Sequence, residues 1–157
     1  MPDTLKPGDA APLFTLNNAA GKPVSLPDFA GQWAVLYFYP KDNTGGCTRE
    51  ARDFSALLSE FRKLNTAVIG VSPDSESSHA RFIERQDISV ELLSDPDREV
   101  CNLYGVWRKK KMAGREYMGV VRSTFLIDPA GTIEKSWYNV RVNGHAENVL
   151  NVRRGAS

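Results

Sequence analysis

Cysteine, net charge and long apolar runs are all scarce in this sequence. Its 157 residues include two cysteines, too few for the disulfide scaffold of a small secreted domain. The 20 Lys and Arg residues nearly balance the 19 Asp and Glu residues, for a formal net charge of +1. No bulk field therefore favours nucleic acid or an anionic membrane, and we expect neither as a partner.

Segments typical of membrane insertion, export or phosphate binding are missing as well. No apolar run approaches the roughly 20 residues of a membrane-spanning helix. The first residues, Met1–Lys6, lack the apolar core of a signal peptide, so we expect a cytoplasmic protein. Gly45 and Gly46 stand together without the spacing or the lysine of a phosphate-binding loop.

The overall composition suits one compact domain. A chain of this length with 41% hydrophobic residues can bury most of its apolar surface in a single core. The sequence has no internal repeat, linker or low-complexity segment. We expect one domain over residues 1–157.

Strands and helices alternate along the chain. Apolar runs predict strands at residues 12–16, 23–26, 33–39, 66–72, 90–93, 123–128 and 132–138. Helical spacing of apolar residues predicts helices over about 45–64, from the cap Ser77 to residue 86, over 97–104 and over 146–152. The first two strands form an N-terminal hairpin in this prediction. The pattern indicates an α/β fold, with a mixed central sheet covered by helices on both faces.

The segment from Pro40 to Cys47 carries the strongest chemical signal. It leads from the buried strand 33–39 through a tight turn into the long helix that begins near residue 45. With Thr44 as the N-cap, Cys47 is the third helical residue, where backbone N–H groups have no partner within the helix. The helix dipole favours an anion at this point, and a thiolate is such an anion. Arg122 is the predicted cation beside it.

These positions match a known signature. Pro40, Thr44 and Cys47 have the P-x-x-x-T-x-x-C spacing of the peroxiredoxins, and Glu50 matches the acidic residue that commonly follows. Arg122 lies where the family has its active-site arginine. The strings at residues 38–44, 92–97, 104–107, 122–128 and 144–150 resemble the bacterioferritin comigratory protein, or Q-type, branch.

The resemblance covers roughly residues 5–152 and implies a fold and an activity. It implies a thioredoxin-like fold and a thiol-specific peroxidase that reduces hydrogen peroxide and organic hydroperoxides through a cysteine sulfenic acid. It implies no cofactor. The reductant would be an external thiol: thioredoxin, glutaredoxin or a low-molecular-weight thiol. We expect a monomer, with a weak homodimer as the alternative.

The residue types fit this chemistry. Cys47 supplies the nucleophile, and Arg122 stabilises the thiolate and the charge that develops on the peroxide. We expect the Thr44 hydroxyl to accept from a backbone N–H and to donate to the thiolate or the peroxide. Backbone N–H groups of Gly46 and Cys47 would bind substrate, and Pro40, which has no N–H, would shield the sulfur from water. For Glu50 we weigh a supporting role, in which it orients Arg122, against a solvated helix position.

A second cysteine to resolve the sulfenic acid is not where Q-type peroxiredoxins have it. Arg52 occupies one such position, and Phe82 and Ile83 stand where the other could have been. Cys101 remains, and we interpret it as a half-buried structural thiol, with a two-cysteine mechanism through Cys101 as the alternative. Gly45 also departs from the family, which usually has proline there, and glycine loosens the loop.

Three further features have ordinary explanations. We expect His79 to lie at a solvated helix start and His145 at a helix N-terminus, and neither has a second ligand at metal spacing, so no metal site is predicted. The basic run Arg108–Lys111 is interpreted as a solvated loop. Two other function classes stay open: a redox sensor or chaperone that uses the same cysteine, and a thiol-disulfide oxidoreductase, which the lack of a C-x-x-C motif opposes.

Overall fold

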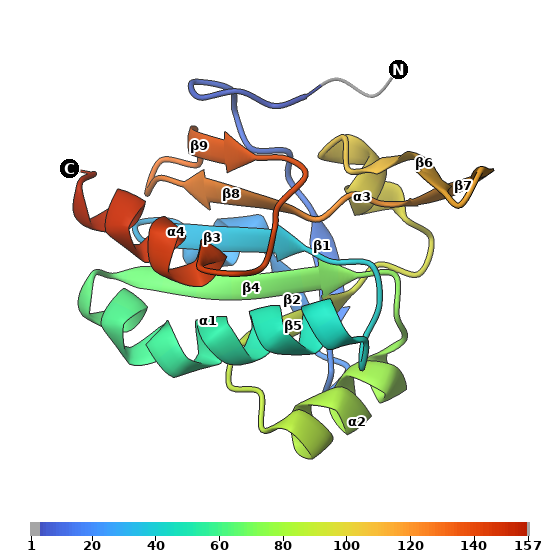
Figure 1. Ribbon diagram of the computed structural model, residues 1–157. Helices are drawn as coiled ribbons and strands as arrows, with labels where there is room; N and C mark the ends of the chain where they lie inside the picture. The colour runs from blue at the N-terminus through green and yellow to red at the C-terminus, as the bar shows by residue number, and fades with distance from the viewer. Residues whose placement is uncertain (1–3, 157) are drawn as a thin grey trace.

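The centre of the molecule is a seven-stranded mixed sheet, shown in Figure 1. The computed structural model describes residues 4–156; residues 1–3 and 157 of the predicted domain lie outside this range. The strand order is β2-β1-β5-β4-β3-β8-β9. The strands are β1 (Thr15–Asn18), β2 (Pro23–Ser25), β3 (Trp33–Phe38), β4 (Thr66–Ser72), β5 (Glu91–Ser94), β8 (Ser123–Ile127) and β9 (Ile133–Trp137).

Strand β3 lies in the interior of the sheet, between β4 and β8, and both of its faces are apolar. Every residue from Trp33 to Phe38 is buried. The strand pairs in parallel with β4 and antiparallel with β8, so its carboxyl end opens next to the carboxyl end of β4. This edge is where the segment 40–47 begins.

Helices lie on both sides of the sheet, as the α/β pattern predicts. The helices are α1 (Gly45–Lys63), α2 (Glu76–Gln86), α3 (Glu99–Leu103) and α4 (His145–Arg154), with a 3-10 turn η1 at Leu26–Phe29. Helices α1, α2 and α4 contribute to one core, and α3 and η1 contribute to the other. None of the helices within residues 4–156 combines the length and the hydropathy that a bilayer span requires.

The two cores use alternate residues of β3. Val35 and Tyr37 pack with Phe54 of α1 and Val149 of α4. Ala34, Leu36 and Phe38 lie on the opposite face, in a core that α3 and the N-terminal segment share. Val100 and Tyr104 belong to this second core. Because side chains alternate across a strand, the sheet separates these two cores.

The N-terminal hairpin is present, but its first strand begins later than predicted. Strand β1 starts at Thr15, whereas the prediction placed it at residues 12–16. Its partner β2 starts at Pro23 as predicted, and Leu16 lies opposite Val24. Pro12 lacks the N–H that a ladder needs, which explains why the strand does not extend back through it.

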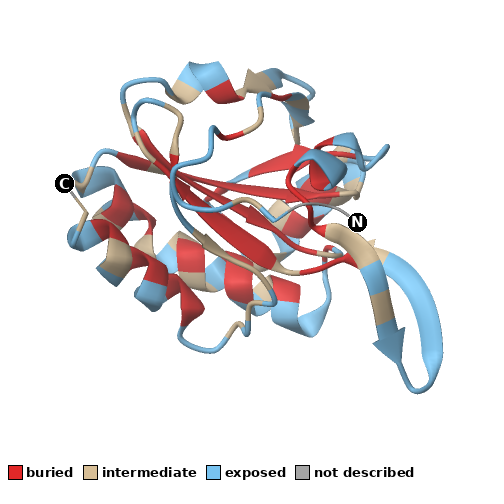
Figure 2. Ribbon diagram, turned by 90° about the horizontal axis from the view of Figure 1, so that it is seen from above, coloured by how far each residue is buried: buried red, intermediate tan, exposed pale blue. Residues whose placement is uncertain are grey.

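The prediction of a solvated loop at Arg108–Lys111 was wrong. These residues belong to β6 (Trp107–Met112), which pairs with β7 (Arg115–Val120) in a separate two-stranded sheet. Ala113 and Gly114 both have positive φ, as a two-residue hairpin turn requires. Most of this hairpin is exposed and projects from the body in Figure 2, so the run is solvated but is a strand.

The N-cap of helix α2 lies two residues before the predicted cap Ser77. Ser75 is the N-cap, and its side chain accepts a hydrogen bond from the Ser78 N–H at 3.1 Å. The helix ends at Gln86, where Asp87 adopts the left-handed conformation. The remaining helix and strand predictions agree with the structure to within a few residues at each end.

Candidate active site

Cys47 lies in the first turn of α1, as predicted. The helix begins at Gly45 with Thr44 as its N-cap, so Cys47 is the third helical residue. The Thr48 N–H makes an early bond to the Thr44 carbonyl at 2.9 Å. The N–H groups before it have no earlier helical carbonyl to bind. Cys47 itself is 1% exposed.

The side chain of Arg122 contacts the Cys47 sulfur. It lies between β7 and β8, and its Nη2 donates to Cys47 Sγ at 3.2 Å. A second nitrogen, Nη1, donates to Glu50 Oε1 at 2.6 Å. One planar guanidinium therefore binds two groups of α1, one turn apart.

Glu50 is a buried partner of Arg122 and not a solvated helix residue. It is 1% exposed, compared with 16% for the Arg122 side chain. Burial raises the pKa of Glu50 to about 7, against the opposing effect of the Arg122 charge. Burial also disfavours the charge on Arg122, but Glu50 and Cys47 more than compensate and raise the pKa of Arg122.

Gly46 leaves room for the guanidinium. A Cβ atom on Gly46 would stand 3.2 Å from Arg122 Nη2. A Cβ on the neighbouring Gly45 would meet nothing within 4 Å. Of these two glycines, Gly46 is therefore the one whose missing side chain lets Arg122 approach the sulfur.

Thr44 is the N-cap, but its hydroxyl has a different role from the one predicted. No backbone N–H of the helix donates to its side chain. The hydroxyl instead donates to the Lys41 carbonyl at 2.8 Å. A hydroxyl has one proton to donate, so in this conformation that proton stabilises the turn before the helix and is not directed at the sulfur.

Tyr37 lies near the end of β3, and Pro40 comes just after that strand. Pro40 follows the buried Tyr39 and is itself half-buried. Tyr37 lies in the same core as Cys47. Burial, and then the charges of Glu50 and Cys47, raise the pKa of the Tyr37 hydroxyl. This hydroxyl therefore stays protonated beside the site.

Cys101 is more buried than predicted and lies in the other core. It is 0% exposed and packs with residues of the face opposite Cys47. Burial and the nearby Asp95 raise the pKa of the Cys101 thiol. Its environment is that of a structural thiol.

The prediction for His79 was wrong, and the prediction that His145 lies at a helix N-terminus is confirmed. His79 is 0% exposed, not solvated, and its Nδ1 lies 2.8 Å from Asp42 Oδ2. His145 does begin α4, but it is buried, and its Nε2 lies 2.8 Å from Thr124 Oγ1. Burial, and then the Arg122 charge, lower the pKa of His145 to about 4.

The sequence analysis missed the buried contact between Asp42 and His79. A signal was present for His79, because Phe82 and Ile83 follow it at helical spacing and place it on the apolar face of α2. A histidine on such a face needs a buried partner. Nothing local identified Asp42 as that partner.

Comparison with known proteins decides the family. Residues 7–136 match the model of the AhpC/TSA family. The chain belongs to this family. Bacillus subtilis peroxiredoxin Bcp is 42% identical over 154 residues, which are 98% of each chain. The Bcp protein of Helicobacter pylori J99 is 51% identical over 148 residues, 94% of this chain and 97% of the relative.

A solved structure of this branch has the same fold. The C47S mutant of Xylella fastidiosa PrxQ superposes with a TM-score of 0.92 at 39% identity, covering 98% of both chains. The resemblance to Q-type peroxiredoxins and the predicted thioredoxin-like fold are therefore confirmed. The chain is a peroxiredoxin, an enzyme that reduces peroxides at the expense of a thiol.

Proposed function

We propose that Cys47 is the peroxidatic nucleophile and that Arg122, Gly46 and Thr44 form its substrate site. One observation carries this assignment: the Cys47 sulfur lies in the first turn of α1 and 3.2 Å from Arg122 Nη2. The helix end and the guanidinium both favour an anion at this point. Peroxide attack needs a thiolate and donors for the leaving oxygen, and this arrangement supplies both.

The reaction we propose has three steps. The thiolate attacks one peroxide oxygen, the O–O bond breaks, and the other oxygen leaves with the electron pair and takes up a proton as water or an alcohol. Cys47 becomes a sulfenic acid. An external thiol displaces water from it to form a mixed disulfide, and a second thiol releases Cys47 and leaves as a disulfide.

Each neighbour has an assigned role in this proposal. Arg122 binds the thiolate and the departing oxygen, and Glu50 orients Arg122. The N–H groups of Gly46 and Cys47 bind the substrate. Thr44 reaches the peroxide only if its hydroxyl turns away from the Lys41 carbonyl. Pro40 restricts the access of water to the sulfur.

We propose hydrogen peroxide and small organic hydroperoxides as substrates. A solved relative supports the organic class: the Xanthomonas campestris bacterioferritin comigratory protein, studied for alkyl peroxide reduction, has a TM-score of 0.88 at 40% identity, over 94% of this chain and 98% of that one. Thioredoxin, glutaredoxin or a low-molecular-weight thiol would be the reductant. We propose that a monomer does this in the cytoplasm without the help of Cys101.

The Cys47→Ser variant tests the proposal. We expect it to lose peroxide consumption while its circular dichroism stays that of the parent. Mass spectrometry of the parent after one equivalent of peroxide should show oxygen added at Cys47, and thioredoxin should remove it. Full activity in the Cys47→Ser variant would contradict the assignment, and oxidation without turnover would favour a redox sensor.

A further inference from the structure

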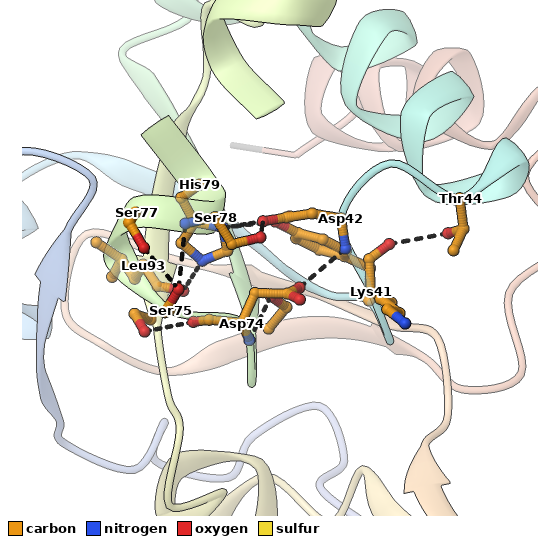
Figure 3. Close-up of polar contacts among 12 residues, drawn as sticks. Lys41, Asp42, Thr44, Asp74, Ser75, Ser77, Ser78, His79 and Leu93 are labelled. Atoms are coloured by element: carbon orange, nitrogen blue, oxygen red, sulfur yellow. Dashed lines mark hydrogen bonds and ion pairs between the residues drawn. The ribbon is translucent and has the colours of Figure 1, made fainter. Parts of the chain in front are cut away.

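A buried polar cluster lies beneath the loop that leads into α1. We call Tyr39, Asp42, Asp74, Ser78 and His79 the loop-anchor cluster; four of these residues are labelled in Figure 3. They come from three segments: the end of β3 and its loop, the turn after β4, and α2. Asp42 is 6% exposed and His79 is 0% exposed. None of these contacts includes Cys47 or Arg122.

Asp42 is the centre of the cluster. Its Oδ1 accepts from the Tyr39 hydroxyl at 2.7 Å, and its Oδ2 accepts from the Ser78 hydroxyl at 2.8 Å. Its own N–H donates to Asp74 Oδ2 at 2.9 Å. The loop segment 40–44 has no helix or strand, and Asp42 is its one buried residue. The position of the loop thus depends on these bonds.

His79 connects Asp42 to the body of the protein. Its Nδ1 lies 2.8 Å from Asp42 Oδ2, and its Nε2 lies 2.9 Å from the Leu93 carbonyl. The Leu93 carbonyl and the Asp42 carboxylate are both acceptors, so each ring nitrogen of His79 faces an acceptor. The pair is a buried imidazole and carboxylate within hydrogen-bond distance of each other.

The ionisation of Asp42 agrees with this geometry. Burial would raise its pKa, but hydrogen bonds from His79, Tyr39 and Ser78 outweigh burial and lower it. The same bonds leave little for a metal ion to bind. Asp74 Oδ2 already accepts from Ser72 and from the Asp42 N–H, so we assign no metal to the group Asp42, Asp74 and His79.

We propose that the Asp42–His79 pair positions Cys47: it holds the loop so that the first turn of α1 presents the sulfur to Arg122. Asp42 comes two residues before the N-cap Thr44 and five before Cys47. His79 in turn is fixed to β5 through the Leu93 carbonyl. When the pair is broken, the loop loses its attachment, and the first turn of α1 opens before the rest of the fold.

This inference rests on the proposed role of Cys47, but its main test does not need catalysis. Both cysteines are buried in the native protein, so a bulky maleimide reacts with each only when its surroundings open. Peptide mass spectrometry then gives a separate labelling rate for Cys47 and for Cys101. Cys101 serves as the internal control for opening elsewhere in the molecule.

Three variants remove different parts of the anchor. His79→Ala removes both ring nitrogens, His79→Asn keeps a donor that can reach Asp42, and Ser78→Ala removes the hydrogen bond from the Ser78 hydroxyl. We expect His79→Ala to speed Cys47 labelling by about tenfold or more, because hydrogen bonds to charged groups are the strong ones. The other two variants should have smaller effects in the same direction. The Cys101 rate should not change.

Asp95→Asn is the matched control. Asp95 is also a buried carboxylate, and it accepts from the Val100 and Cys101 N–H groups at the start of α3. Loss of the Asp95 carboxylate should speed labelling of Cys101 and leave the labelling rate of Cys47 unchanged. Equal acceleration of both cysteines in His79→Ala would indicate general destabilisation and would overturn the proposal. An unchanged Cys47 rate would overturn it as well.

Kinetics give a second readout. In His79→Ala, kcat/KM for peroxide should fall by about tenfold or more, while kcat/KM for the thiol reductant should stay the same or rise, because an open loop exposes the sulfenic acid. A parallel fall in both constants would contradict a positioning role. Activity in Cys47→Ser would remove the proposed function but leave the labelling result intact, so the two failures are distinguishable.

Discussion

Arg122 is the residue on which the site geometry depends most directly. Its two terminal nitrogens bind two different acceptors, Glu50 and Cys47, at 2.6 and 3.2 Å. A guanidinium can do this because its N–H groups are fixed in one plane. A lysine ammonium is a single point charge on a flexible stem and would have to divide its contacts between the two groups.

We therefore expect Arg122→Lys to slow peroxide attack by about tenfold to a hundredfold. Stopped-flow kinetics with hydrogen peroxide measure this effect. Arg108→Lys, in the β6–β7 hairpin, is a suitable control and should leave the rate unchanged. If Arg122→Lys reacts at the parental rate, the arginine does not act on the sulfur.

Glu50 makes the stability of the fold depend on pH. The pKa of Glu50 rises from 4.5 to about 7 because the carboxyl is buried. Between these values the folded chain binds more protons at this site than the unfolded chain does. Proton binding to Glu50 therefore stabilises the folded chain fully below pH 4.5. This stabilisation is lost as the pH rises through about 7.

The variant Glu50→Gln should remove this dependence. Going from about pH 5 to about pH 8, the free energy of unfolding of the parent should fall relative to that of Glu50→Gln by on the order of 1–3 kcal/mol. Urea denaturation across this range measures the slope for both proteins. Parallel curves for the two proteins would show that Glu50 does not titrate in this way.

At the scale of elements, the first turn of α1 combines two glycines with different functions. Gly46 lies against Arg122, with 3.2 Å between its ideal Cβ and Nη2, whereas Gly45 has open space around it. Both glycines lower the intrinsic stability of the helix start. Of the two positions, only residue 46 has a steric reason to be glycine, because a side chain there would crowd Arg122.

A pair of alanine variants separates these functions. Gly45→Ala and Gly46→Ala should each favour the helix by up to about 1 kcal/mol, yet we expect only Gly46→Ala to slow peroxide attack, by several-fold, as the new methyl group displaces Arg122. Thermal unfolding and peroxide kinetics on both variants provide the comparison. Equal rates in the two variants would mean that Arg122 adjusts without cost.

Over the whole molecule, the central sheet separates the two cysteines. Cys47 packs into the core under α1 and α4, and Cys101 packs into the core on the other face. A disulfide needs Cα atoms within about 7 Å. To meet Cys47, Cys101 would have to leave its core together with α3, at the cost of buried contacts such as those of Val100.

We therefore expect Cys101→Ser to keep peroxidase turnover with thioredoxin and with small thiols, within about twofold of the parent. Serine in a buried apolar position should lower the free energy of unfolding by about 1–3 kcal/mol. Steady-state assays and urea denaturation measure these effects. Loss of turnover with every reductant, or an isolated Cys47–Cys101 disulfide after peroxide treatment, would instead establish a two-cysteine mechanism.

The sequence alone determined those features that contiguous residues encode. The apolar run at 33–39 and the helical spacing after Gly45 placed the strand, the helix and the N-cap, and with them the position of Cys47. Such features follow from the side-chain periods of strands and helices and from capping, which are local. The fold class followed from the alternation of these elements.

Only the tertiary structure decided which distant groups meet. Glu50 and Arg122 are 72 residues apart, and Asp42 and His79 are 37 apart. The local spacing places His79 on an apolar helix face but does not identify Asp42 as its partner. The pairing of β6 with β7 and the face of the sheet that Cys101 occupies have no local pattern strong enough to reveal them. The physical reason is that these contacts arise only when the sheet order brings separate segments together, and that order is a property of the whole packed chain.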